Sequence, residues 1–228
     1  MAIGARTIGL PGSRPIRAII FDMDGTLLDS LPVVLDCYRR TVVEFGGPDL
    51  LPEEIFAAFA IGPAATMLEA LIGRRVGAEA IASYEARLDT EKKRVVVYDD
   101  VRDTVASLSR WMPLGVFTAA DTRAAELLLA ATGLRESLGP VLGADAAQRP
   151  KPAPDGLIAV AERLGLSPTE LAYVGDGPAD VEVARGCGAL AVAAGWGSLY
   201  HESHDADVTM RSPAELLGFV PDPSVAER

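Results

Sequence analysis

The stretch that decides the fold is residues 17–30, which read RAIIFDMDGTLLDS. It begins with a short apolar run that contains β-branched residues, and this run stops abruptly at Asp22. A continuous apolar run of this length is typical of a strand that is buried on both faces, as in a parallel sheet. Two carboxylates, Asp22 and Asp24, follow the run directly. Because ligands bind beyond the carboxyl ends of the strands in open α/β sheets, we predict that both acids lie at the functional site.

Similar apolar runs and helical patterns alternate through the rest of the chain. The further predicted strands are residues 114–117, 141–142, 171–174 and 189–192. The predicted helices around them are residues 101–111, 122–131, 155–164 and 179–185. This alternation is typical of an α/β fold with a doubly wound parallel sheet and right-handed crossovers.

The alternation is interrupted between Pro32 and Tyr98. Four amphipathic helices are predicted in this stretch, and no strand is predicted before Val95; the helices are residues 33–45, 52–59, 64–71 and 78–94. An insertion after the first strand of such a sheet lies over the carboxyl ends of the strands. We therefore predict a small α-helical cap domain that can act as a lid.

The predicted domain organisation follows from these boundaries. Residues 1–15 are predicted to form a flexible N-terminal tail and residues 221–228 a C-terminal tail. Between them, residues 32–98 form the cap, and residues 16–31 and 99–220 together form a discontinuous core.

The composition limits the classes of partner. The 228 residues carry a formal net charge of -11, which repels nucleic acid and anionic membranes. No segment approaches the roughly 20 consecutive apolar residues of a membrane helix, and the N-terminus lacks the apolar run of a secretory signal. We expect a cytoplasmic protein, monomeric or homodimeric, with Cys37 and Cys187 as small buried residues rather than a disulfide.

Polar residues stand at the end of several predicted strands. Thr118 follows one strand directly, and Lys151 precedes a helix in the sequence RPKP. Asp176 and Asp180 follow the 171–174 strand in the sequence GDGPAD. Since the carboxyl ends of parallel strands meet at one edge of the sheet, these side chains are expected to converge on one crevice with the first two acids.

The motif order DxDGT, Thr, Lys, GDxxxD resembles that of the haloacid dehalogenase superfamily of phosphohydrolases. FDMDGTLLDS at residues 21–30 is the most specific element, and the resemblance extends from about Arg17 to Leu217. It points to the branch with a helical cap between the first and second motifs, to which phosphoglycolate phosphatase-like enzymes belong. The resemblance implies a Rossmann-like core and a phosphoric monoester hydrolase.

The resemblance also implies a role for each motif residue, and the chemistry is consistent with it. Asp22 would attack phosphorus and form an aspartyl-phosphate, while Asp24 would protonate the leaving oxygen and later deprotonate water. The remaining predicted phosphate contacts are the backbone amides of Asp24, Gly25, Thr26 and Ala119, the hydroxyl of Thr118 and the charge of Lys151.

Four carboxylates in one crevice predict a metal site. Asp22, Asp24, Asp176 and Asp180 would repel one another, and a hard divalent cation relieves that repulsion. Mg²⁺ is the expected cofactor, because it prefers oxygen ligands and phosphate. We expect direct ligands from the Asp22 carboxylate, the Asp24 backbone carbonyl and Asp176. Asp180 would bind the metal through water or hold Lys151.

Several neighbouring residues are expected to have ordinary roles. Asp29 and Ser30 are interpreted as caps of the first cap helix. Residues 201–205, HESHD, are interpreted as a solvated loop beyond the last core strand, and the basic residues of the predicted cap as solvated surface. Two departures from the family pattern stand out. Ala119-Ala120 replaces a polar side chain that is common after the Thr, and residues 98–101, YDDV, replace a Pro-Gly-type turn where the cap rejoins the core.

Other readings of the motifs remain open. A phosphosugar mutase of the β-phosphoglucomutase type would use the same residues, whereas dehalogenases of the superfamily lack the second Asp. A receiver domain would be much shorter, and a non-catalytic phosphate-binding module would be expected to lack Asp22 or Asp24. The expected substrate is a small phosphorylated metabolite (an acid, sugar or nucleotide), since a closed lid leaves no room for a macromolecule. Residues 60–66 of the predicted cap are mostly small and apolar, and they do not indicate which metabolite is bound.

Overall fold

A six-stranded parallel sheet forms the core of the computed structural model, which describes residues 15–202 and 205–220. The strand order is β5-β4-β1-β6-β7-β8. The strands are β1 (Ala18–Phe21), β4 (Leu114–Phe117), β5 (Val141–Leu142), β6 (Leu171–Gly175), β7 (Leu190–Ala194) and β8 (Val208–Met210). Because β1 pairs with β4 on one side and with β6 on the other, the carboxyl ends of these three strands lie side by side. The predicted doubly wound parallel sheet is confirmed.

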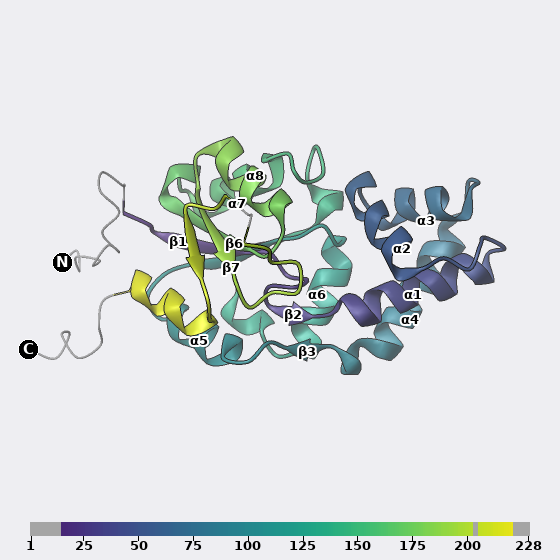
Figure 1. Cartoon of the computed structure of the whole chain (residues 1–228), viewed down its shortest axis with the longest axis horizontal. Coiled ribbons are helices and arrows are strands. Elements are labelled where there is room, and N and C mark those ends of the chain that lie inside the picture. The colour runs from purple at the N-terminus through teal and green to yellow at the C-terminus, as the bar shows by residue number, and fades with distance from the viewer. Residues whose placement is uncertain (1–14, 203–204, 221–228) are drawn as a thin grey trace, which may run out of the picture.

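Helices cover both faces of this sheet, as Figure 1 shows. The core helices are α5 (Val101–Leu108), α6 (Thr122–Ala131), α7 (Asp155–Leu164) and α8 (Pro178–Cys187). Successive side chains of β1 point to opposite faces. Ile19 and Phe21 therefore pack with α5 and α6, while Ala18 and Ile20 pack with α7 and α8. The burial of both faces explains why β1 reads as an unbroken apolar run.

The remaining short elements are 3₁₀ turns. They are η1 (Ala58–Ile61), η2 (Lys92–Arg94), η3 (Arg135–Ser137), η4 (Ala144–Ala146), η5 (Pro168–Glu170) and η6 (Pro213–Phe219). None of the helices in the described part of the chain combines the length and the apolarity needed to cross a bilayer.

Four helices gather at one end of the molecule and form the helical cap (Figure 1). They are α1 (Leu31–Glu44), α2 (Pro52–Ala57), α3 (Ala64–Ile72) and α4 (Ala78–Glu91). The central helix is α1, which packs against the other three. The spacing of one helical face is followed by its buried residues, which are Val33, Val34, Cys37, Tyr38, Thr41 and Val42. Cys37 is thus a buried free thiol, as expected, and Cys187 is a half-buried one.

Two strands were missed by the sequence analysis. Leu28–Asp29 forms β2, which pairs antiparallel with β3 (Val96–Val97) where the chain passes between core and cap. The expectation that the described stretch from Pro32 onward contains no strand before Val95 is confirmed; β2 lies ahead of that stretch and escaped prediction because a two-residue strand has too few residues to show a periodicity.

The second missed strand is β8, which extends the sheet beyond β7. The interpretation of residues 201–205 as lying beyond the last core strand was therefore wrong. Only three residues, Val208–Met210, form this strand, so its pairing with β7 rather than its local pattern decides it. Of the HESHD segment, Ser203 and His204 lie outside the described residues, as do residues 1–14 and 221–228 of the predicted tails.

The turn that leads from the cap back to the core keeps an unusual backbone conformation. Asp100 has a φ of 62°, in the left-handed region that glycine adopts most easily. Asp is among the residues that tolerate this region. The turn that a Pro-Gly sequence forms in the family pattern is thus made here by Asp99-Asp100, and helix α5 begins directly after it and ends at Leu108, short of the predicted 111.

Candidate active site

A cavity of about 160 Å³ lies between the carboxyl edge of the sheet and the cap. The core side of its lining contains predicted site residues from four separate segments: Asp22, Asp24, Thr118, Ala119, Lys151, Asp176 and Asp180. The sheet topology brings these segments together, because each follows or lies beside the carboxyl end of β1, β4 or β6. Gly25 and Thr26 do not line the cavity.

Lys151 connects two of the acids. Its Nζ donates to Asp22 Oδ1 and to Asp180 Oδ1, each at 2.7 Å. The same nitrogen lies 5.2 Å from the ring centroid of Phe117 and 5.3 Å from that of Tyr173. Burial by itself would lower the pKa of Lys151, but the two carboxylates outweigh it and raise that pKa. Lys151 is therefore a fixed, permanently charged group against one oxygen of Asp22.

Asp180 is held in place from several directions. Its Oδ2 accepts from the Gly177 amide at 3.0 Å, and its Oδ1 accepts from the Tyr173 hydroxyl at 3.2 Å as well as from Lys151. The Tyr173 hydroxyl also lies 2.8 Å from the carbonyl oxygen of Phe117, so it is fully engaged. Sequence reasoning missed Tyr173. Its only signal was a polar tip inside an otherwise apolar strand, since a buried Tyr hydroxyl needs a partner.

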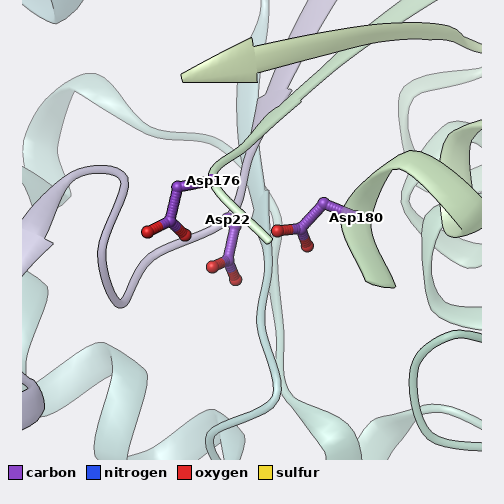
Figure 2. Close-up of side chains that lie close together, drawn as sticks. All are labelled: Asp22, Asp176 and Asp180. Atoms are coloured by element: carbon purple, nitrogen blue, oxygen red, sulfur yellow. The ribbon is translucent and has the colours of Figure 1, made fainter. Parts of the chain in front are cut away.

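Three carboxylates face a common space, as Figure 2 shows for Asp22, Asp176 and Asp180. One oxygen from each lies within 4.8 Å of the others. Burial raises the pKa of Asp22, the charge of Lys151 opposes that rise, and the neighbouring carboxylates add to it. Burial likewise raises the pKa of Asp176 to about 6, against a 2.8 Å hydrogen bond from the Leu199 amide. Buried oxygen donors this close together fit a divalent cation.

Asp24 lies outside that group of three and has its own partners. Its carboxylate accepts a hydrogen bond from the Ser30 hydroxyl and another, at 3.3 Å, from Thr118 Oγ1. Burial raises the pKa of Asp24, while Ser30, the charge of Lys151 and Thr118 partly oppose that rise. A raised pKa lets a carboxyl group carry a proton closer to neutral pH, which is what a general acid needs.

Ser30 therefore differs from its expected role as a helix cap. It occupies the N-cap position of α1, yet its side chain makes no capping hydrogen bond. The fully buried hydroxyl is turned toward Asp24 instead. Asp29 is exposed and forms half of β2, so it is not the cap either. The short β2 strand brings the chain back past Asp24, and this return could not be seen in the sequence.

The expected phosphate contacts of Gly25 and Thr26 are also not what the structure shows. The Gly25 amide donates to Leu28 O at 2.8 Å and the Thr26 amide to Met23 O at 3.3 Å, so both are used within the turn. Gly25 has a φ of 88°, and a Cβ there would clash with the carboxylate of Asp176. Thr26 Oγ1 donates to Asp176 Oδ1 at 3.5 Å. These two residues therefore pack against Asp176 rather than line the cavity.

We expect Ser30→Ala to lower kcat about 10-fold, part of the 10²–10⁴-fold that a positioned general acid contributes. The variant loses one of two hydrogen bonds that hold Asp24, and since that bond lowers the pKa of Asp24, the corresponding pKa in the pH–rate profile should rise. Steady-state kinetics from acidic to alkaline pH measure both effects. Ser30→Thr keeps the hydroxyl and is the control. An unchanged kcat together with an unchanged pH profile in Ser30→Ala would contradict the role.

Comparisons with known proteins agree with this geometry. A family model described as haloacid dehalogenase-like hydrolase matches residues 16–188. The phosphoglycolate phosphatase of Chromobacterium violaceum is 33% identical over 214 residues, which cover 90% of this chain and 96% of that protein. The crystal structure of CbbY from Rhodobacter sphaeroides in complex with phosphate has a TM-score of 0.77 at 22% identity, over 88% of this chain and 96% of that one. A mutant of CbbY in complex with xylulose-(1,5)bisphosphate also has a TM-score of 0.77 at 20% identity, and the match covers 90% of this chain and 100% of that one.

The chain belongs to the haloacid dehalogenase-like hydrolase family. Within that family it is a phosphoglycolate phosphatase-like protein, an enzyme of the phosphoric monoester hydrolase class. The likeness to CbbY, at its low identity, shows the fold alone.

Proposed function

We propose that this chain is a Mg²⁺-dependent phosphatase that hydrolyses a small-molecule phosphomonoester through an aspartyl-phosphate on Asp22. The observation that carries the proposal is the contact between Asp22 and Lys151. A carboxylate at the end of the central strand is buried, and one of its oxygens is held at 2.7 Å by a charged amine whose side chain is 8% exposed. This arrangement orients the second oxygen, and the charge of Lys151 favours the ionised form of Asp22 that a nucleophile requires, in opposition to burial.

In the first step, an oxygen of Asp22 attacks phosphorus while the bond from phosphorus to the leaving alcohol oxygen breaks. Asp24 donates its proton to that oxygen, so the product leaves as a neutral alcohol. Lys151 and the hydroxyl of Thr118 lie at the cavity wall, where they can stabilise the negative charge of the transferring phosphoryl group. Ala119, also on that wall, is proposed to contribute its backbone amide.

In the second step, Asp24 is ionised and accepts a proton from water, whose oxygen attacks phosphorus. The bond between phosphorus and Asp22 breaks, inorganic phosphate leaves, and both acids return to their initial state. The hydrogen bond from Ser30 keeps Asp24 in one place through both steps, while the single hydroxyl proton of Thr118, which is donated to Asp24 in the free protein, would turn to the phosphoryl group. One group can serve as acid and then as base because the two proton transfers occur at the same position.

The residues present fit the proposed cofactor. Asp22, Asp176 and the backbone carbonyl of Asp24 would hold Mg²⁺, which prefers oxygen donors of this kind. When bound, it would neutralise phosphate charge and hold the phosphate in place. Asp180 is proposed to act mainly by holding Lys151, because its carboxylate already accepts hydrogen bonds from that side chain, from Tyr173 and from Gly177.

The cap helices support a small substrate. They form one wall of the cavity, whose volume of about 160 Å³ excludes a folded protein or duplex nucleic acid. The net charge of -11 also disfavours nucleic acid and membrane partners. We propose that residues 32–98 act as a cap domain on a core made of residues 16–31 and 99–220, with a small phosphorylated metabolite enclosed between them in the cytoplasm.

A phosphate-release screen tests this function. The purified chain is assayed with Mg²⁺ against small phosphomonoesters, a phosphoprotein and 5′-phosphorylated DNA, with Asp22→Asn as the control for contaminating activity. We expect at least one small ester to be hydrolysed by the wild type alone, faster than either macromolecule. A macromolecular substrate that is turned over faster than every small ester would overturn the proposal.

A further inference from the structure

The cap side of the cavity is made of aromatic and aliphatic side chains. We call this surface the aromatic wall and define it by six residues: Val34, Tyr38, Phe56, Phe59, Met67 and Tyr84. They come from α1, α2, η1, α3 and α4, so every helix of the cap contributes to the wall. The wall stands opposite the acids of the core across the same cavity, where the alcohol part of a bound phosphomonoester would lie.

The rings of the wall form one contiguous surface. Tyr38 stacks on Tyr84 with ring centroids 4.2 Å apart, and Tyr38 also contacts Phe59 at 6.0 Å. Phe56 continues the series at 5.5 Å from Phe59. Ring pairs at these separations stabilise one another, so this surface is preformed rather than assembled by the ligand.

The hydroxyls of Tyr38 and Tyr84 do not form a binding site for an anion. Their hydroxyls are hydrogen-bonded to each other, which leaves less capacity for a ligand. Burial raises the pKa of both Tyr38 and Tyr84, and the rings therefore stay neutral. Together they offer a polarisable face with a satisfied polar tip.

Positive charge is scarce in this cavity. Among the described residues that line it, Lys151 is the only Lys or Arg, and it is already paired with Asp22 and Asp180. The basic side chains of the cap do not line the cavity, and several of them form ion pairs with acidic side chains of the cap. These pairs include Arg39–Asp49 at 2.5 Å, Arg40–Glu91 at 3.2 Å, Arg87–Glu44 at 2.6 Å and Arg94–Glu91 at 3.1 Å.

A second anionic group on the substrate would therefore be buried against rings without a counter-charge. Burial of an unpaired carboxylate or phosphate is strongly unfavourable, whereas an apolar group gains from the same contact. A cavity of about this volume is known to hold one benzene-sized group.

Building on the proposed function, we propose that the substrate is the phosphomonoester of a small, uncharged, largely apolar alcohol. Phosphoglycolate, with its carboxylate, and sugar bisphosphates, with their second phosphate, are disfavoured by the same wall. The names of the relatives thus describe the shared phosphate chemistry of the core and not the alcohol that this cap selects. The wall also argues against the mutase alternative, because a bisphosphate intermediate needs a place for two phosphates.

The test compares esters that differ mainly in charge. Isobutyl phosphate replaces the carboxylate of phosphoglycolate by an isopropyl group of similar shape, and benzyl phosphate is paired with 4-carboxybenzyl phosphate. With Mg²⁺ present, we expect kcat/KM for the neutral member of each pair to be higher by about 100-fold. A higher kcat/KM for phosphoglycolate than for isobutyl phosphate would overturn the proposal.

Two cap variants locate the effect. Phe56→Arg adds a cation to the aromatic wall. It should shift the ratio of kcat/KM between the neutral and the carboxylated ester toward the carboxylated one by about 10-fold. Leu51→Arg adds the same charge at a side chain that is 64% exposed and lies outside the cavity, so the ratio should stay as in the wild type. Equal shifts in both variants would contradict the assignment to the wall.

A binding measurement separates this proposal from the function on which it rests. Asp22→Asn is titrated with the same esters in the presence of Mg²⁺ by calorimetry. Tighter binding of benzyl phosphate than of 4-carboxybenzyl phosphate supports the wall even if the wild type turns over neither ester, which would sink the phosphatase function alone. Equal or reversed affinities overturn the proposal whatever the activity.

Discussion

Replacement of Asp22 by Asn is expected to lower kcat by about 10⁴-fold or more, which corresponds to roughly 5.5 kcal/mol of activation free energy. The amide of Asn is a poor nucleophile and cannot form the aspartyl-phosphate. Its oxygen can still accept the hydrogen bond that Asp22 Oδ1 receives from Lys151. The loss should therefore come from the chemistry and not from unfolding, and phosphate release by the purified variant measures it directly.

Two controls accompany this variant. Thermal melting should show that Asp22→Asn stays folded, because the substitution removes one of several mutually repelling buried carboxylates. Asp24→Asn should be nearly as inactive toward alkyl phosphates, but should lose less with an aryl ester whose leaving group needs no proton. More than a tenth of wild-type activity in Asp22→Asn would exclude its role as the nucleophile.

Removal of divalent cations is expected to abolish turnover. The cavity holds several buried carboxylates against a single Lys, and a phosphate dianion cannot join them without further positive charge. Treatment with EDTA should stop phosphate release, Mg²⁺ should restore it, and Ca²⁺ should restore it poorly because its coordination is looser. Full activity after thorough chelation would contradict the metal site.

The cation should also be detectable without substrate. Mg²⁺ at about 100 times its dissociation constant stabilises the folded state by about 2.7 kcal/mol, which a melting curve resolves. The folded-state pKa of Asp176 is raised to about 6, so below that pH the carboxyl group binds a proton and competes with the metal. The affinity for Mg²⁺ should therefore fall as the pH falls through 6. Asp176→Asn should weaken binding at every pH, and an unaltered melting shift in that variant would remove Asp176 from the ligand set.

The fold could be predicted from the sequence because its main signals are local. A strand buried on both faces must be apolar throughout, and parallel strands need intervening helices, so β1, β4, β6 and their helices are visible in the pattern of residues. The two strands that escaped prediction, β2 and β8, have two and three residues. Strands this short are stabilised by their partner strands; β5 also has two residues, but both are apolar and buried, and this gave it the local signal that β2 and β8 lack.

The sequence by itself determined which chemistry-bearing residues stand at the ends of the parallel strands, among them Asp22, Thr118 and Asp176. The carboxyl edge of a parallel sheet brings such positions together whatever the side-chain details. Only the tertiary structure decided which way these groups and their neighbours face. Ser30 contacts Asp24 rather than its own helix, the Gly25 amide faces its own turn, and the cap presents rings rather than charges to the cavity. These three features depend on how distant segments pack together or on the path of a turn. Neither leaves a local pattern in the sequence from which it could be predicted.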